Sequence, residues 1–411
     1  MSLNLGYNST SKASKVKDVT DLKEEIHQEL IRLLDYWSSE VIDTRHGGFL
    51  GRIDHFGEID LSAPKGIVLN ARILWTFSSA YRITGIEKYK EAANRAYNYL
   101  MTHFWDQQNG GFVWEVDFQG RKSNVRKQTY AQGFGIYALA EYNRACANVE
   151  ALEYARQLFY ILETRVHDNK FGGYVEALSN DWSKLDDMRL SPKDDNTPKS
   201  MNTHLHILEP YTNLFRVWPD KKLKESIENL LVIFHNKIID PKTGHFNLFF
   251  DTNWSVKSSI VSYGHDIEGA WLMHEAALTI RDFEIIKEVR KTAIKLVDVT
   301  LNEGTDVDGS LYNEKHGNIL DKEKHWWPQA EALVGLLDAY SINGQIRYLE
   351  EFVKIWTFIK EKLIDTKNGE WYWRVDMNGT PITTDDKVGF WKCPYHNCRA
   401  LMEILERIEH L

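Results

Sequence analysis

Two pairs of residues in the sequence place an imidazole and a carboxylate three positions apart. His265 and Glu268 lie in SYGHDIEGAWL, and His206 and Glu209 lie in MNTHLHILE. Residues at this spacing share one face of a helix. A carboxylate beside an imidazole raises the histidine pKa toward working pH, which suits proton transfer. We therefore expect His265 to act as an acid or base and Glu268 to orient it and support its imidazolium form.

Other polar and aromatic residues recur near the starts of later helical patterns, at steps that follow an internal repeat. They are Asn70, Arg72, Tyr130, Gln132, Asn202, His204, His206, Trp326, Trp327, Glu331, Trp391 and His396. His204 and His206 are two residues apart and point to opposite sides of a helix, so at most one of them faces a cavity. Arg72 lies in an apolar segment, where it either pairs structurally or binds an anion.

Proton transfer at carbon uses these groups best. Two histidines on opposite faces of a substrate can remove a proton beside a carbonyl and return one to the other face. Arg72 would stabilise the enediolate between the two steps, and indole rings would form platforms for a sugar. No metal or cofactor is needed for this chemistry.

Several other readings of the same residues stay open. A metal site could use the two His-x-x-Glu pairs, although helical dimetal sites have the opposite order. A glycoside hydrolase would need two carboxylates, for which Glu268, Glu314 and Glu331 are candidates. A sugar-binding barrel without activity is the non-enzymatic alternative.

The elements that position these residues are predicted by a sixfold repeat. Six segments begin with Asp and continue through a glycine-containing turn into alternating apolar residues; they start at Asp43, Asp106, Asp168, Asp240, Asp306 and Asp365. The period is therefore about 60 residues. Helical patterns lie in pairs between the turns, alternately amphipathic, as in 22–37, and apolar all round, as in 68–84.

About twelve helices in six pairs predict an all-α (α/α)6 barrel, with short β-hairpins between outer and inner helices. An open superhelix of helix pairs is the structural alternative. In a closed barrel the starts of all inner helices converge at one end of the cavity. We expect residues 1–17 to form a mobile N-terminal tail and residues 18–411 to form one catalytic domain.

Composition narrows the class of partner. The 411-residue chain is 43% apolar and 27% charged, with a formal net charge of −9 and both signs interspersed. This argues against nucleic acid or an anionic membrane as the main partner. No apolar run is long enough for a membrane span, and three cysteines make no disulfide framework. We expect a cytoplasmic protein that acts as a monomer, with a dimer as the alternative.

Five motifs of the chain resemble the N-acylglucosamine 2-epimerase superfamily, and within it the cellobiose 2-epimerases most closely. In chain order they are NARILW (70–75), SMNTHLHILE (200–209), SYGHDIE (262–268), HWWPQAEALVG (325–335) and FWKCPYHN (390–397). The resemblance implies an (α/α)6 barrel without cofactor or metal. It also implies reversible inversion at C2 of the reducing-end glucose of β-1,4-linked disaccharides, cellobiose giving glucosyl-mannose and lactose giving epilactose.

The resemblance further implies a role for each matching residue. His396 removes the C2 proton from the glucose form, and His265 reprotonates the opposite face through a cis-enediolate. Glu268 supports His265, His206 assists at the carbonyl and ring oxygen, and Arg72 stabilises the enediolate. The substrate-binding residues are Tyr130, Asp194, Asn202, Glu314, Trp326, Trp327 and Trp391.

The choice of substrate stays open at this point. Trp391 favours a disaccharide, because a second sugar needs a platform of its own. Mannose 2-epimerases and aldose–ketose isomerases that act on monosaccharides share the barrel, and they remain the alternative. Some isomerisation of lactose to lactulose is expected beside epimerisation, since both products arise from the same enediolate.

Overall fold

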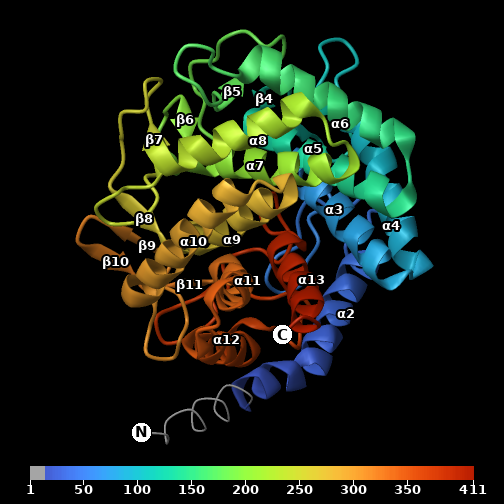
Figure 1. Cartoon of the computed structure of the whole chain (residues 1–411). Coiled ribbons are helices and arrows are strands. Elements are labelled where there is room, and N and C mark those ends of the chain that lie inside the picture. The colour runs from blue at the N-terminus through green and yellow to red at the C-terminus, as the bar shows by residue number, and fades with distance from the viewer. Residues whose placement is uncertain (1–13) are drawn as a thin grey trace, which may run out of the picture.

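The computed structural model describes residues 14–411, in which twelve α-helices alternate between an outer layer and an inner ring (Figure 1). The outer helices are α2 (Lys23–Ser39), α4 (Glu87–Tyr99), α6 (Val149–Ile161), α8 (Lys221–Ile233), α10 (Phe283–Gly304) and α12 (Ile346–Phe358). The inner helices are α3 (Ile67–Thr84), α5 (Thr129–Cys146), α7 (Met201–Val217), α9 (Tyr263–Ile280), α11 (Trp326–Asn343) and α13 (Tyr395–Ile408). Each inner helix packs against the next, and α13 packs against α3. The ring is therefore closed, and the predicted (α/α)6 barrel is confirmed.

The predicted N-terminal tail lies mostly outside the described residues, which begin at residue 14. Residues 14–21 are helical, so helical structure starts before the predicted boundary at residue 17. The division into a tail and one domain stays a prediction.

Burial explains the alternation that the sequence shows. Residues 67–80 of α3 are all buried, because this helix contacts both ring neighbours and an outer helix. The outer helix α4 buries only one stripe, which includes Tyr89, Ala93 and Ala96. A helix enclosed by others is apolar all round, whereas one that covers a surface is amphipathic.

The two kinds of connection differ as predicted. Inner helices lead to the next outer helix through short links, such as Gly85 and Ile86 between α3 and α4. Gly85 ends α3 with φ 68°, a left-handed conformation that glycine adopts without a steric penalty. Four outer helices end in five-residue π-helical turns, η1 (Leu100–Phe104), η2 (Leu162–Val166), η3 (Phe234–Ile238) and η4 (Ile359–Leu363).

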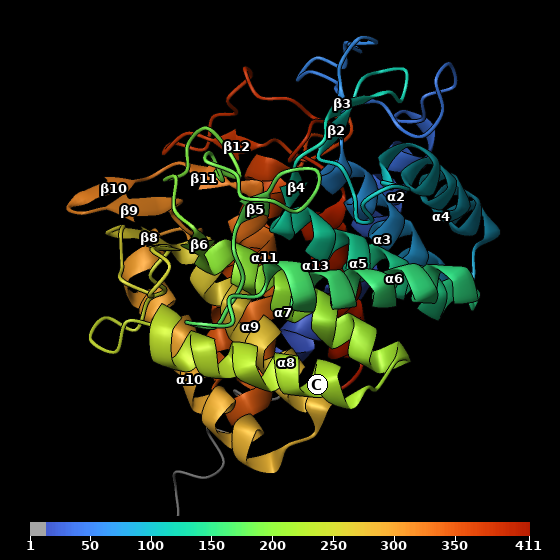
Figure 2. The same ribbon diagram turned by 90° about the horizontal axis from the view of Figure 1, so that it is seen from above.

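The longer outer-to-inner connections carry all the described strands, which lie at one end of the barrel (Figure 2). They are β1 (Lys65–Gly66), β2 (Glu115–Val116), β3 (Lys122–Asn124), β4 (Lys127–Gln128), β5 (Ala177–Leu178), β6 (Lys199–Ser200), β7 (Phe249–Phe250), β8 (Ile260–Ser262), β9 (Glu314–His316), β10 (Ile319–Asp321), β11 (Lys324–His325) and β12 (Arg374–Val375). The strand before an inner helix pairs antiparallel with a strand of the next connection, as in β1–β2, β4–β5, β6–β7, β8–β9 and β11–β12. These ladders join neighbouring repeats, in addition to local hairpins such as β9–β10.

A buried lysine holds the Asp-initiated turn in five of the six repeats. The pairs are Lys65–Asp43 at 2.7 Å, Lys127–Asp106 at 2.9 Å, Lys199–Asp168 at 2.7 Å, Lys324–Asp306 at 2.5 Å and Lys387–Asp365 at 2.8 Å. The fourth repeat has Val261 two residues before its inner helix, where four others have lysine. There His245 pairs with Asp266 at 2.6 Å instead.

No helix among residues 14–411 is both long and apolar enough to cross a bilayer.

Candidate active site

The inner helices all begin at the strand-bearing end of the barrel, and their first turns line a cavity of about 510 Å³. All twelve predicted catalytic and substrate-binding residues line it. Arg72 comes from α3, Tyr130 from α5, His206 from α7, His265 from α9 and His396 from α13. The structure therefore brings together residues that are more than 300 positions apart in sequence.

His396 is held by a carboxylate that lies on the neighbouring inner helix. Its Nδ1 lies 2.6 Å from Oε1 of Glu331 on α11. An ionised carboxylate only accepts hydrogen bonds, so Nδ1 carries the hydrogen and Nε2 keeps its lone pair. Burial lowers the pKa of His396 well below its usual value, and the charges of Arg72 and Arg399 lower it further. His396 is therefore a neutral imidazole that can accept a proton.

His265 is held by a hydroxyl. Its Nδ1 lies 2.7 Å from Oγ of Ser262, the residue that immediately precedes α9. Burial lowers the pKa of His265 to about 3, with a smaller contribution from nearby His206. This overturns the expectation that a carboxylate raises it. The ring lies 4.7 Å from that of Trp327, measured between centroids.

The predicted pair of Glu268 with His265 does not form in the described structure. Glu268 instead accepts a hydrogen bond of 2.8 Å from Arg399 Nη2, and its carboxylate lies 3.9 Å from Nδ1 of His396. Spacing along a helix brings two side chains to one face but does not fix their partners. Here Ser262 takes the imidazole and Arg399 takes the carboxylate.

The same spacing does give a pair in α7. His206 Nδ1 lies 3.1 Å from Oε2 of Glu209, and burial lowers the pKa of His206 to about 4. The helix is kinked at His206, with φ −88° and ψ 17°. Pro210 explains the kink, because its ring clashes with the carbonyl four residues earlier. A Cβ on Gly133 of α5 would lie 2.2 Å from the displaced carbonyl oxygen of His206, so this approach requires glycine.

His204 is a core residue, as one of the two α7 histidines had to be. Its Nδ1 lies 2.7 Å from the carbonyl oxygen of Ser200, and its Nε2 accepts a hydrogen bond of 3.0 Å from the backbone N–H of Tyr174. His206 is the one that lines the cavity.

Arg72 is a buried cation with neutral neighbours. Nη2 donates a 2.8 Å hydrogen bond to the Tyr130 hydroxyl, and Nη1 lies 3.7 Å from Sγ of Cys393. The guanidinium lies 4.3 Å from the ring centroid of Phe134. No carboxylate forms an ion pair with Arg72 within residues 14–411, so its charge is available to an anion in the cavity. The structural-pair alternative for Arg72 is therefore not favoured.

A second arginine, Arg399 on α13, lies beneath the cavity and was missed from the sequence. It donates hydrogen bonds to Glu209 on α7, Glu268 on α9 and Glu331 on α11, the last at 2.5 Å. One signal was present, since Arg399 is a charged residue three positions after His396 in an inner helix. Ligand atoms of Glu268, Glu331 and His396 lie within 4.8 Å of one another, as in a metal site, but the Arg399 guanidinium already provides the cation there.

The hydrolase alternative fits this geometry poorly. Glu268 and Glu331 are bridged by Arg399, and their closest oxygens lie within 4.8 Å. Retaining glycosidases separate their carboxyl groups by about 5–5.5 Å with the sugar between them. Glu314 lies on β9 at the rim, where it pairs with His316 at 3.0 Å.

Aromatic rings form the walls. Trp327 lies close to both histidines, with its ring centroid 4.7 Å from that of His265 and 5.6 Å from that of His396. Trp391 packs against Tyr130 at 5.9 Å. Trp326 is largely buried and packs on Trp373 at 4.9 Å. Trp373 also lines the cavity and was not predicted, although the sixth turn contains the aromatic run EWYWRVD.

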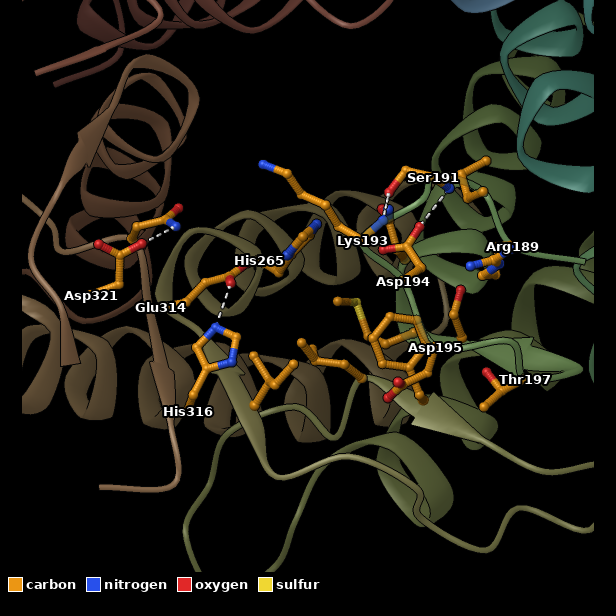
Figure 3. A pocket seen from close by; sticks show the side chains of 18 of the residues that line it. Arg189, Ser191, Lys193, Asp194, Asp195, Thr197, His265, Glu314, His316 and Asp321 are labelled. Carbon is orange, nitrogen blue, oxygen red and sulfur yellow. Dashed lines mark hydrogen bonds and ion pairs between the residues drawn. The ribbon is translucent and has the colours of Figure 1, made fainter. Parts of the chain in front are cut away.

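The cavity continues into an outer lobe of about 380 Å³ at the rim (Figure 3). The lobes share His265, Asp194, Asn202 and Glu314. Charged side chains line the outer lobe, among them Arg189, Lys193, Asp194 and Asp195, which Figure 3 labels on one side of the pocket. Asp194 Oδ2 accepts a 2.8 Å hydrogen bond from the Ser191 N–H, and burial raises its pKa. A polar lobe therefore adjoins an aromatic one.

Comparison with known proteins agrees with the geometry. Residues 48–400 match the model of the family described as N-acylglucosamine 2-epimerase (GlcNAc 2-epimerase). The chain is 47% identical over 388 residues to a cellobiose 2-epimerase of Bacteroides fragilis, covering 93% of this chain and 98% of the relative. It is 38% identical to a cellobiose 2-epimerase of Dictyoglomus turgidum, covering 95% and 100%. The solved structure of cellobiose 2-epimerase from Spirochaeta thermophila superposes with a TM-score of 0.91 at 37% identity, covering 96% and 98%.

Proposed function

The chain belongs to the N-acylglucosamine 2-epimerase family and is a carbohydrate epimerase, and we propose that its substrates are β-1,4-linked disaccharides. The reaction is reversible inversion at C2 of the reducing-end glucose, from cellobiose to glucosyl-mannose and from lactose to epilactose. The observation that carries the proposal is the pair of imidazoles, His265 and His396, on one cavity, with the indole of Trp327 close to both.

The proposed mechanism starts from a neutral His396, whose pKa is lowered by burial. The sugar ring opens first, with His206 assisting at the carbonyl and ring oxygen. His396 then accepts the C2 proton through its free Nε2, and the electron pair moves into the C1–C2 bond and onto the carbonyl oxygen. Arg72 faces the resulting enediolate without a carboxylate of its own to neutralise it. His265 takes a proton from solvent as negative charge develops on the enediolate and passes it to the opposite face of C2, while His396 releases its proton to solvent. The two histidines exchange roles in the reverse direction.

Substrate length is supported by the aromatic wall and by the relatives. Trp391 and Trp327 are separate platforms on the same cavity, and the outer lobe adds polar side chains beyond them. The relatives at 47% and 38% identity are cellobiose 2-epimerases. The three cysteines are free thiols, which fits the proposed reducing cytoplasm. The monomer expected from the sequence stays a prediction.

The test is proton NMR of the purified protein with cellobiose in deuterium oxide, with mannose in a parallel tube. Loss of the C2 proton signal together with growth of glucosyl-mannose supports the proposal. Exchange with mannose alone keeps the two-histidine chemistry but assigns the protein to the monosaccharide epimerases and isomerases. Exchange in neither tube contradicts the mechanism and favours a sugar-binding barrel.

A further inference from the structure

Three carboxyl groups contact a single guanidinium group, that of Arg399, beneath the cavity, so the charges there are unequal. Arg399 contacts Glu209, Glu268 and Glu331, and all four side chains are buried. Arg72 supplies the second positive charge on the same cavity. Burying an unmatched negative charge is costly, so a buried cluster of this kind takes up a proton. One proton on one carboxyl group makes the cluster neutral.

The hydrogen-bond donors identify the carboxyl group that holds it. Glu209 accepts from Arg399, from Tyr395 at 2.5 Å and from His206 at 3.1 Å. Glu331 accepts from Arg399, from His396 at 2.6 Å and, through its other oxygen, from Trp271 Nε1 at 3.1 Å.

Glu268 has a single donor. Oε1 accepts from Arg399 at 2.8 Å, and Oε2 has no hydrogen-bond partner within residues 14–411. Each donor stabilises the ionised form of a carboxyl group, so Glu268 is the least stabilised anion of the three.

The pKa directions agree with this assignment. Burial raises the pKa of Glu268 well above its usual value, and the charge of Glu331 raises it further. Burial acts on Glu209 in the same sense, but Arg399 and His206 outweigh it and lower the pKa of Glu209 to about 2. Burial also raises the pKa of Glu331, against the opposing effect of Arg399.

The free oxygen of Glu268 lies where the reaction takes place. Glu268 lines the cavity together with His206, His265 and His396. Its Oε2 lies 4.0 Å from Nε2 of His206, too far for a hydrogen bond but near enough for both groups to reach one substrate atom. A carboxylic acid here has an O–H group at the cavity wall that no acceptor within residues 14–411 takes.

We propose that Glu268 is a neutral carboxylic acid whose Oε2–H donates a hydrogen bond to the carbonyl oxygen of the open-chain sugar. This role rests on the proposed function and replaces the support of His265 expected from the sequence. As the C2–H bond breaks, the proton passes to His396 and negative charge gathers on the carbonyl oxygen. Glu268 keeps its own proton throughout and stabilises that charge together with Arg72. Buried carboxylic acids act as oxyanion donors in the same way in ketosteroid isomerase.

The first arm of the test compares substitutions at one position. Glu268→Gln retains an N–H donor of similar size, so we expect its kcat to stay within about tenfold of wild type. Glu268→Ala removes the donor, and we expect a loss of about 10²–10³-fold, as for other oxyanion-hole donors. If Glu268→Gln is as inactive as Glu268→Ala while keeping the wild-type circular dichroism spectrum, a negative charge is required and the proposal is wrong.

The second arm uses infrared difference spectroscopy and needs no active variant. Wild-type protein at pH 8 should show the carbonyl band of a protonated carboxylic acid, absent from Glu268→Gln, and the band should shift when cellobiose is added. Absence of the band means an ionised Glu268 and overturns the proposal. A band that does not shift, in protein that exchanges the C2 proton of cellobiose, overturns the hydrogen bond to substrate. If cellobiose is not exchanged, the proposed function fails, and the band still decides the protonation state.

Discussion

His396 and His265 lie in the first turns of inner helices on the same cavity, but their surroundings differ in kind. His396 contacts the ionised network of Glu331 and Arg399. His265 contacts the neutral hydroxyl of Ser262, in the one repeat of the six whose Asp-initiated turn is not held by a buried lysine and which has Val261 two residues before its inner helix. A carboxylate fixes the imidazole tautomer, whereas a hydroxyl can either donate or accept. The difference indicates one histidine with a fixed tautomer and one that can present either a proton or a lone pair to the substrate.

Replacing each histidine in turn tests whether one removes the C2 proton and the other returns it. His396→Asn and His265→Asn should each lower epimerisation by about 10²–10⁴-fold, the usual contribution of a positioned acid or base. His265→Asn should still exchange the C2 proton of cellobiose with solvent deuterium without forming glucosyl-mannose, and His396→Asn should not. Proton NMR, started once from cellobiose and once from glucosyl-mannose, measures both the exchange of the C2 proton and the formation of the other epimer. Normal turnover by His396→Asn would remove that residue from the mechanism.

The carboxylate that holds His396 should have the next largest effect. Glu331→Gln places an amide N–H against Trp271 or Arg399, so the tautomer of His396 is no longer fixed. We expect kcat to fall about 10²-fold, with KM changed much less. Glu288→Gln, on the exposed face of α10, is the matched control for the same chemical change. Equal activity of the two variants would show that Glu331 serves only the packing of the core.

Ser262→Ala should have a much smaller effect. It removes one neutral hydrogen bond, worth about 0.5–1.5 kcal/mol, so kcat should fall about 2- to 10-fold. Trp327 still packs against the His265 ring. Steady-state rates in both directions provide the measurement. A loss as large as that of Glu331→Gln would mean that the two histidines are held equally firmly, against the comparison above.

The acid limb of the pH–rate profile should lie at lower pH than an ordinary histidine would give. A histidine with a lowered pKa stays neutral, and so competent as a base, until pH falls through that lowered value. With the pKa of His265 near 3 and that of His396 also lowered, the acid limb of kcat/KM should lie well below the usual histidine value of about 6.5. A limb near pH 6.5 would contradict the burial of both rings.

The free energy of unfolding should also fall at acid pH. Unfolded histidines bind protons below about pH 6.5, whereas the folded ones do not until their lowered pKa values are reached. The contribution to the free energy of unfolding is therefore complete above about pH 6.5 and is lost as pH falls toward the folded values. Urea titrations at each pH measure the free energy of unfolding, so that a loss of activity in folded protein can be distinguished from unfolding.

The sequence predicts the fold and the membership of the site, because both depend on local pattern. Each Asp-initiated turn and each change from amphipathic to enclosed helix occupies one stretch of chain, and six repetitions leave few arrangements other than a ring. Residues at equivalent repeat positions then meet at one end. This is why Arg72, His265 and His396 are placed correctly from spacing alone.

Partners within the site are not predictable in the same way, because they are set by contacts between distant helices. Glu268 and its partner Arg399 are 131 residues apart, and Glu331 and His396 are 65 apart. The two His-x-x-Glu pairs have the same spacing but different outcomes: a hydrogen bond in kinked α7 and none in regular α9. The buried lysines two residues before four inner helices were equally visible in the sequence, but their aspartate partners required the turn geometry.

The ring closes where the first outer helix meets the last inner one, shown side by side as α2 and α13 in Figure 1. Two indole N–H groups join α2 to the connection that precedes α13: Trp37 of α2 donates to Glu370 at 2.5 Å, and Trp371 donates to Glu29 of α2 at 2.6 Å. The last inner helix, α13, also carries His396 and Arg399. A chain whose other five inner helices have already stacked would thus have nearly all its helical content and no complete proton-transfer machinery. The active site is therefore complete only when α13 has packed into the barrel.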